Sequence, residues 1–128
     1  MNQLDELFKA IESHEFSAIV NLASDVKTFE RILSSEIPLR ELTQQMRNAE
    51  VRTAAYQRAL ALVADRGEEG HEHRWDSALA AYLWLLADTD VSLARLVATR
   101  VAAAPGCWWA RKMAAKVLAP DPAPSSAG

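Results

Sequence analysis

Apolar residues in the first 35 positions recur at intervals of three and four, the spacing of one face of an amphipathic α-helix. Three such stripes follow one another: Leu4, Leu7, Phe8 and Ile11, then Phe16, Ile19, Val20 and Ala23, then Val26, Phe29, Ile32 and Leu33. Ser13 and Asp25 precede the second and third stripes and are suited to cap them. The pattern predicts three helices of roughly ten residues each, which are too short to be stable unless they pack together.

Helical spacing continues beyond Pro38, a residue that suits the first turn of a helix. The stripe that follows changes phase near Asn48, which either caps a new helix or lies within one bent helix. Further helical segments are expected at residues 50–66, 77–89, 90–104 and 107–119, the last after a break at Pro105–Gly106. No segment alternates apolar and polar residues for long, as a strand would. We therefore predict an all-α chain of about six to eight helices, arranged as stacked antiparallel pairs or as an irregular bundle.

The chain also resembles itself. When it is shifted by 40 residues, Leu39 falls on Leu79, Met46 on Leu86 and Glu50–Val51 on Asp90–Val91. The segment EVRTAAYQRALALV resembles the second helix of a HEAT repeat, in which an acid, Val-Arg and spaced alanines recur, and WARKMAAKVL is similar. Ser92 stands where the repeat has arginine. This HEAT-like resemblance covers residues 38–118, and it implies two helix pairs plus a final helix that together form a binding scaffold.

Length and composition fit one globular domain. The chain has 128 residues, half of them apolar, which is enough for a single core. We expect one helical domain over residues 1–119, with short helices at 1–36 and the HEAT-like part at 38–118. The remaining segment, PDPAPSSAG at 120–128, has the composition of a disordered tail.

The sequence predicts a cytoplasmic protein with no membrane contact. The longest uncharged run, near Ser77–Ala87, is far shorter than the roughly 20 residues that a membrane span needs. The first residues carry acids where a signal peptide has basic residues. Cys107 is the only cysteine, so the chain forms no internal disulfide.

Charge is unevenly distributed. Residues 1–90 hold nine Lys/Arg against sixteen Asp/Glu, whereas residues 91–119 hold five Lys/Arg and no acid. In the last helix Trp108 shares a face with Arg111 and Lys112. The tryptophan either makes a cation–π contact within the protein or anchors an interface, since Trp and Arg are frequent hot-spot residues. The predicted partner-binding residues are Trp108, Arg111, Lys112, Arg95, Arg100 and Lys116.

These features favour a non-enzymatic protein-interaction module, such as an adaptor, an inhibitor or an immunity-type protein. Its partner is expected to be acidic at the contact. The alternative is a nucleic-acid-binding protein that uses the same basic helices, with Trp108 stacking on a base. The pI of about 5.6 and the lack of a recognised motif favour a protein partner. Self-association between the acidic N-terminal half and the basic C-terminal helices is a further option.

Two places carry side chains with reactive chemistry. The stretch GEEGHEHRW at 67–75 contains His71 and His73, but a zinc site needs three or four ligands and no diagnostic spacing occurs. We interpret it as a connection, in which Gly67 ends one helix and Gly70 loosens the chain after it. Asp76 then caps the next helix from Ser77, and Trp75 packs onto Ala80. Cys107 is interpreted as a small residue at a helix start. No catalytic, metal or cofactor site is predicted.

Overall fold

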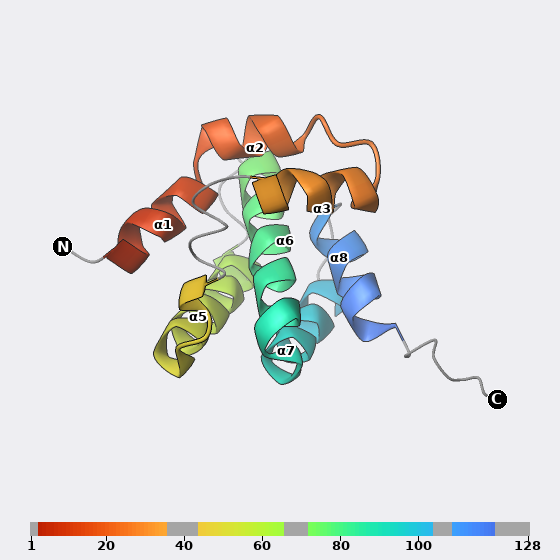
Figure 1. The fold of residues 1–128 in the computed structure, drawn as a ribbon. Helices are drawn as coiled ribbons and strands as arrows, with labels where there is room; N and C mark the ends of the chain where they lie inside the picture. The colour runs from red at the N-terminus through yellow and green to blue at the C-terminus, as the bar shows by residue number, and fades with distance from the viewer. Residues whose placement is uncertain (1–2, 36–43, 66–71, 104–108, 120–128) are drawn as a thin grey trace.

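The computed structural model describes residues 3–35, 44–65, 72–103 and 109–119, and within these segments the chain forms seven α-helices and no strand. The predicted all-α fold is confirmed. The helices are α1 (Gln3–Ile11), α2 (His14–Val20), α3 (Val26–Ser35), α5 (Ala49–Asp65), α6 (Glu72–Thr89), α7 (Val91–Ala103) and α8 (Trp109–Leu118). In Figure 1, α6 stands at the centre, α2 and α3 run across its upper end, α5 and α8 lie to its two sides, and α7 lies at its lower end.

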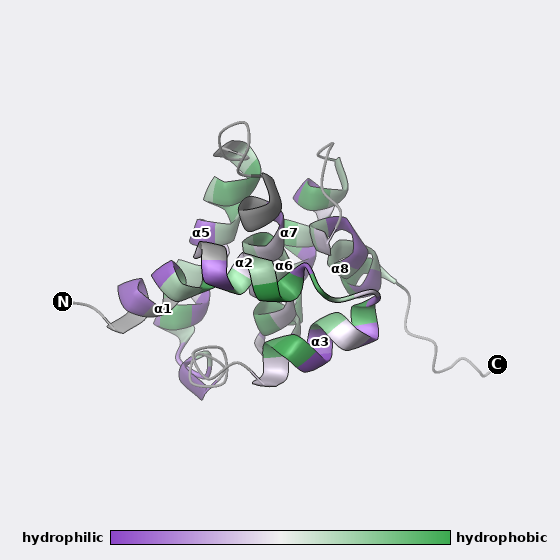
Figure 2. Cartoon of the chain, turned by 90° about the horizontal axis from the view of Figure 1, so that it is seen from above, coloured by the Kyte–Doolittle hydropathy of each residue, from purple (hydrophilic) through white to green (hydrophobic). Residues whose placement is uncertain are grey.

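Helix α6 is the core of the molecule. It packs against α2, α5, α7 and α8, and it buries eight apolar side chains around nearly its whole circumference: Ala78, Leu79, Ala80, Ala81, Tyr82, Leu83, Leu85 and Leu86. A helix that is apolar all round belongs in the interior, so the prediction that this helix is central is confirmed. Figure 2 shows the same contrast, because α6 is mostly apolar whereas α1 and α3 carry strongly hydrophilic positions.

Short-range caps define the starts of three helices as the sequence predicts. The Ser13 side chain accepts a hydrogen bond from the Phe16 amide at 3.1 Å. Asp25 Oδ1 accepts one from the Thr28 amide at 2.7 Å, and this bond lowers the pKa of Asp25 below its ordinary value. Asn48 Oδ1 accepts one from the amide of Glu50 at 2.8 Å. Because residues 46–48 form a turn, α5 is a new helix and not the continuation of a bent one.

The start of α6 differs from the prediction. The helix begins at Glu72 and not at Ser77, so the prediction that Asp76 caps it is wrong, and Trp75 belongs to the helix instead of preceding it. The physical reason is that the Asp76 carboxylate has a distant partner. Its two oxygens accept hydrogen bonds from the amides of Trp109 at 2.7 Å and Ala110 at 2.8 Å. Asp76 therefore caps α8, not its own helix.

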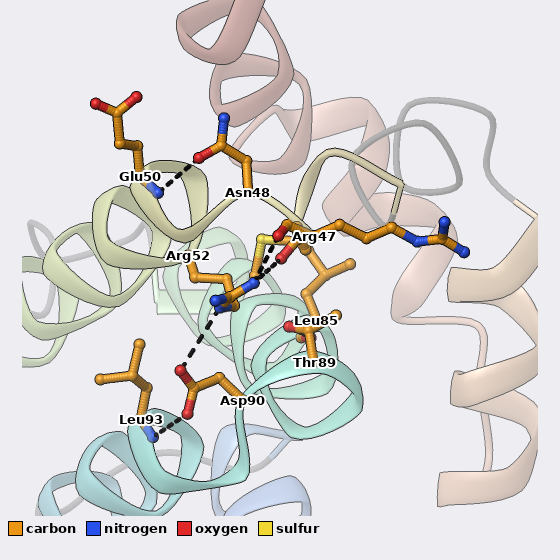
Figure 3. A network of polar contacts seen from close by, with 9 residues as sticks. Arg47, Asn48, Glu50, Arg52, Leu85, Thr89, Asp90 and Leu93 are labelled. Carbon is orange, nitrogen blue, oxygen red and sulfur yellow. Dashed lines mark hydrogen bonds and ion pairs between the residues drawn. The ribbon is translucent and has the colours of Figure 1, made fainter.

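Arg52 joins three segments at one side of the molecule (Figure 3). Its guanidinium donates to the carbonyl oxygens of Met46 at 2.8 Å and Arg47 at 2.9 Å. It also lies 3.6 Å from the carboxylate of Asp90, whose other oxygen accepts from the Leu93 amide at 3.3 Å and so caps α7. One side chain thereby links the turn before α5 to the start of α7.

Several predictions concern residues outside the described segments: the helix start at Pro38, the turns at Gly67 and Gly70, the role of Cys107, and the tail at 120–128. Among the helices that are described, none is both long and apolar enough to cross a membrane. The HEAT-like pairing of helices stays a prediction.

Candidate functional site

Helices α7 and α8 each pack one face against the core. Buried side chains on one face of each helix are Ala94, Val97, Ala98 and Val101 on α7, and Trp109, Ala110, Met113, Ala114 and Val117 on α8. Trp109 stacks on Phe29 of α3, with ring centroids 4.5 Å apart, which confirms that this tryptophan belongs to the core. With Asp76 fixing the first turn of α8, both helices present their other faces outward at defined positions.

All five predicted cations in the described segments are exposed. Arg95 and Arg100 lie on α7, and Arg111, Lys112 and Lys116 lie on α8. The sixth predicted residue, Trp108, lies outside the described residues. We call the five cations the basic surface.

Arg111 is placed against the end of α7. Its guanidinium donates a hydrogen bond to the carbonyl oxygen of Ala102 at 3.2 Å. The last carbonyl groups of a helix carry partial negative charge, so a cation is favourable there. The contact holds the two basic helices together at this corner and fixes the direction of the Arg111 side chain.

Lys116 faces a different neighbour. It forms an ion pair with Glu30 of α3, on the side of α8 away from Arg111. An exposed pair of this kind contributes about 0–1 kcal/mol, but it neutralises much of the charge that Lys116 was predicted to offer a partner. The structure therefore brings Arg111 next to α7 and places Lys116 at the boundary with α3, so these two predicted residues face different neighbours.

Exposed apolar side chains accompany these cations. Leu96 is 54% exposed and Val91 50% exposed on α7, and Leu118 is 40% exposed on α8. Sequence reasoning missed all three as site residues. The information was present, since these positions fall off the buried stripes of their own helices. Large apolar side chains between arginines are typical of protein-binding surfaces.

A shallow groove of about 320 Å³ lies where α3, α6, α7 and α8 meet. Its lining residues are Glu30, Trp84, Ala87, Asp88, Val91, Met113, Lys116 and Val117. Trp84 is only partly buried and shows part of its ring to this groove. Five of these lining residues are apolar and three are charged, and two of the charged ones, Glu30 and Lys116, form an ion pair with each other. Within the described segments Asp88 makes no ion pair, and it is exposed.

A second cluster, on the other side of α6, involves Glu12, Arg58 and Tyr82. Glu12 accepts a hydrogen bond from Arg58 Nε at 2.6 Å and a second, shorter one from Arg58 Nη2. Glu12 Oε2 also accepts from the Tyr82 hydroxyl at 2.5 Å, while the ring of Phe8 meets that of Tyr82 edge-on at 5.4 Å. Sequence reasoning missed this cluster, whose members are 46 and 70 positions apart.

The hydrogen bonds of this cluster hold three helices together, so its role is structural. Burial, and next the charge of Glu12, raise the pKa of Tyr82 well above its ordinary value. The hydrogen bonds to Glu12 also raise the pKa of Arg58. The phenol therefore stays protonated and donates its hydrogen bond at all physiological pH values, and the guanidinium stays charged. Both hold the carboxylate of Glu12 so that the end of α1 is fixed to α5 and α6.

No metal-binding group emerges from the part of the chain that is described: it contains no cluster of three or more His, Cys, Asp or Glu side chains placed to hold an ion. His71, Cys107 and the side chain of His73 lie outside that part. Comparison with family models, curated proteins and solved structures finds no match for this chain.

Proposed function

We propose that this chain is a cytoplasmic, non-enzymatic protein-interaction module, of the adaptor, inhibitor or immunity type, that binds an acidic partner through α7 and α8. The observation that carries the proposal is the combination of exposed Leu96 and Leu118 with exposed arginines on two helices whose opposite faces are buried. Apolar side chains supply contact area that excludes water, and arginines supply charge and directional hydrogen bonds.

Electrostatics supports an acidic partner. Residues 91–119 contain no Asp or Glu, so α7 and α8 themselves carry no acidic side chain that would repel an acidic partner. Complementary charge increases the rate of encounter and disfavours wrong partners. A nucleic acid would use the cations but not Leu96 or Leu118, and Lys116 is already paired with Glu30. The proposal therefore favours a protein over a nucleic acid.

The test is affinity capture from the host's lysate with three forms of the full chain: wild type, the double variant Arg111→Glu/Lys112→Glu, and Arg47→Glu. The last form makes the same kind of charge change at an exposed arginine in the turn before α5, whose side chain points away from that helix (Figure 3). We expect one protein to be retained stoichiometrically by wild type and by Arg47→Glu, in the presence of nuclease, and to be lost from the double variant. Retention should weaken only modestly at moderate salt.

Two results would contradict the proposal. Equal capture by the double variant would show that α8 does not carry the contact. Capture that disappears with nuclease, with a steep dependence on salt, would instead support nucleic-acid binding by the same helices.

A further inference from the structure

Three exposed side chains follow one another across the junction of α6 and α7 in the order acid, apolar, base. Asp88 and Val91 line the same groove, and Val91 and Arg95 are four residues apart on one side of α7. All three are exposed. We call Asp88, Val91 and Arg95 the junction strip.

Both charges of the junction strip lack a counterion within the described segments, where neither Asp88 nor Arg95 forms an ion pair. Asp88 also lies in the last turn of α6, a turn that contains no basic residue. A helix C-terminus carries partial negative charge, so a carboxylate there is unfavourable and an external cation would be stabilising. The neighbouring Glu30 is already neutralised by Lys116. Asp88 is thus the charge in the groove that a new cation fits.

A strip ordered acid, apolar, base is complementary to itself. Rotation by half a turn about its middle places the acid of one copy on the base of the other, and the apolar residue on its own counterpart. This is the condition for an isologous interface, the commonest kind in homodimers.

We propose that two copies of this chain associate through the junction strip, around a two-fold axis near Val91. Asp88 of each copy pairs with Arg95 of the other, and the two Val91 side chains meet at the axis. This inference goes beyond the proposed function, since it needs no other protein and shares only Arg95 with the basic surface.

The first test measures the mass of the purified chain in solution by sedimentation equilibrium, from low micromolar to millimolar concentration. The strip is short compared with a stable interface of roughly 1,200–2,000 Å², so we expect reversible dimers with a dissociation constant in the micromolar range. Asp88→Arg and Arg95→Glu should each weaken association at least tenfold, because like charges then face each other twice per dimer. The combined Asp88→Arg/Arg95→Glu variant should regain most of the wild-type affinity. Arg47→Glu, at an exposed arginine outside both the junction strip and the basic surface, is the matched control and should dimerise like wild type.

A second measurement tests the position of the axis. In a Cys107→Ser background, Val91→Cys places one thiol where the two copies should meet, and mild oxidation should give a covalent dimer. Arg47→Cys in the same background should stay monomeric. Unchanged circular dichroism in every variant confirms that each remains folded.

A wild-type chain that is monomeric up to millimolar concentration would overturn the inference. It would also be overturned if both single charge-reversal variants dimerised as tightly as wild type, or if the double variant dimerised as weakly as either single variant. These results concern the purified chain alone, so they leave the capture experiment on the Arg111→Glu/Lys112→Glu variant to decide the proposed function separately.

Discussion

The carboxylate of Asp76 is buried where α6 meets α8, and it accepts hydrogen bonds from two amide groups at the start of α8. The first amides of a helix have no partner inside the helix, and a side-chain oxygen that satisfies them stabilises it. Negative charge is also favourable at this end of a helix. In most helices the capping side chain belongs to the residue just before the first turn, whereas α8 is capped by a side chain of another helix, α6.

Replacing Asp76 should therefore cost more than an ordinary cap. We expect Asp76→Ala to lower the free energy of unfolding by about 2–3 kcal/mol, because two buried amides lose a charged acceptor. Asp76→Asn keeps one acceptor oxygen and should lose roughly half as much. Urea unfolding followed by tryptophan fluorescence measures both. An alanine variant within about 0.5 kcal/mol of wild type would show that the cap is not needed.

Tyr82 should make the stability of the protein depend on alkaline pH. In the unfolded chain the phenol ionises near its ordinary pKa of about 10, while in the folded chain burial and Glu12 raise the pKa of Tyr82. Unfolding above pH ~10 therefore releases a proton, and this contribution to stability, fully present below that pH, decreases as the pH rises.

Tyr82→Phe isolates this effect. At neutral pH it should cost about 1–2 kcal/mol, since Glu12 loses one hydrogen bond but keeps Arg58. The difference between wild type and Tyr82→Phe in unfolding free energy should shrink between pH ~9 and ~11. A difference that stays constant over that range would mean that the phenol ionises equally in both states.

At the scale of elements, Arg52 connects the turn before α5 to the start of α7. It binds the carbonyl groups that end the turn before α5, and it approaches Asp90, the cap of α7. We expect Arg52→Met, which keeps the aliphatic stem but removes the donors, to lower the free energy of unfolding by about 1–2 kcal/mol. Arg47→Met, at an exposed neighbour, should change it by less than about 0.5 kcal/mol. Thermal unfolding of the two variants side by side gives the comparison, and equal losses would contradict it.

Elements were predictable where their determinants are local. Ser13, Asp25 and Asn48 each bond an amide two or three residues away, and a window of a few residues contains both partners. The start of α6 was not predictable in this way. Asp76 suits a local cap by its residue type, and nothing nearby in the sequence reveals that its partners lie 33 and 34 positions further on.

At the scale of the whole molecule, the periodicity of apolar residues was sufficient for the fold class and for the central position of α6. It was not sufficient for the arrangement of the site. The sequence groups Arg111 and Lys116 in one helix, but packing turns Arg111 toward α7 and Lys116 toward Glu30. The groove at the α6–α7 junction has residues from four helices, so it exists only once the tertiary packing of those helices is known.

The cap that α6 provides for α8 has a consequence for hydrogen exchange. Amides in the first turn of a helix normally exchange quickly with solvent deuterium, because fraying at the helix end exposes them. The amides of Trp109 and Ala110 are buried against Asp76, so they exchange only when α6 and α8 separate. The slow exchange of these two amides would then report the opening of the whole core. In most helices, first-turn amides report only local fraying.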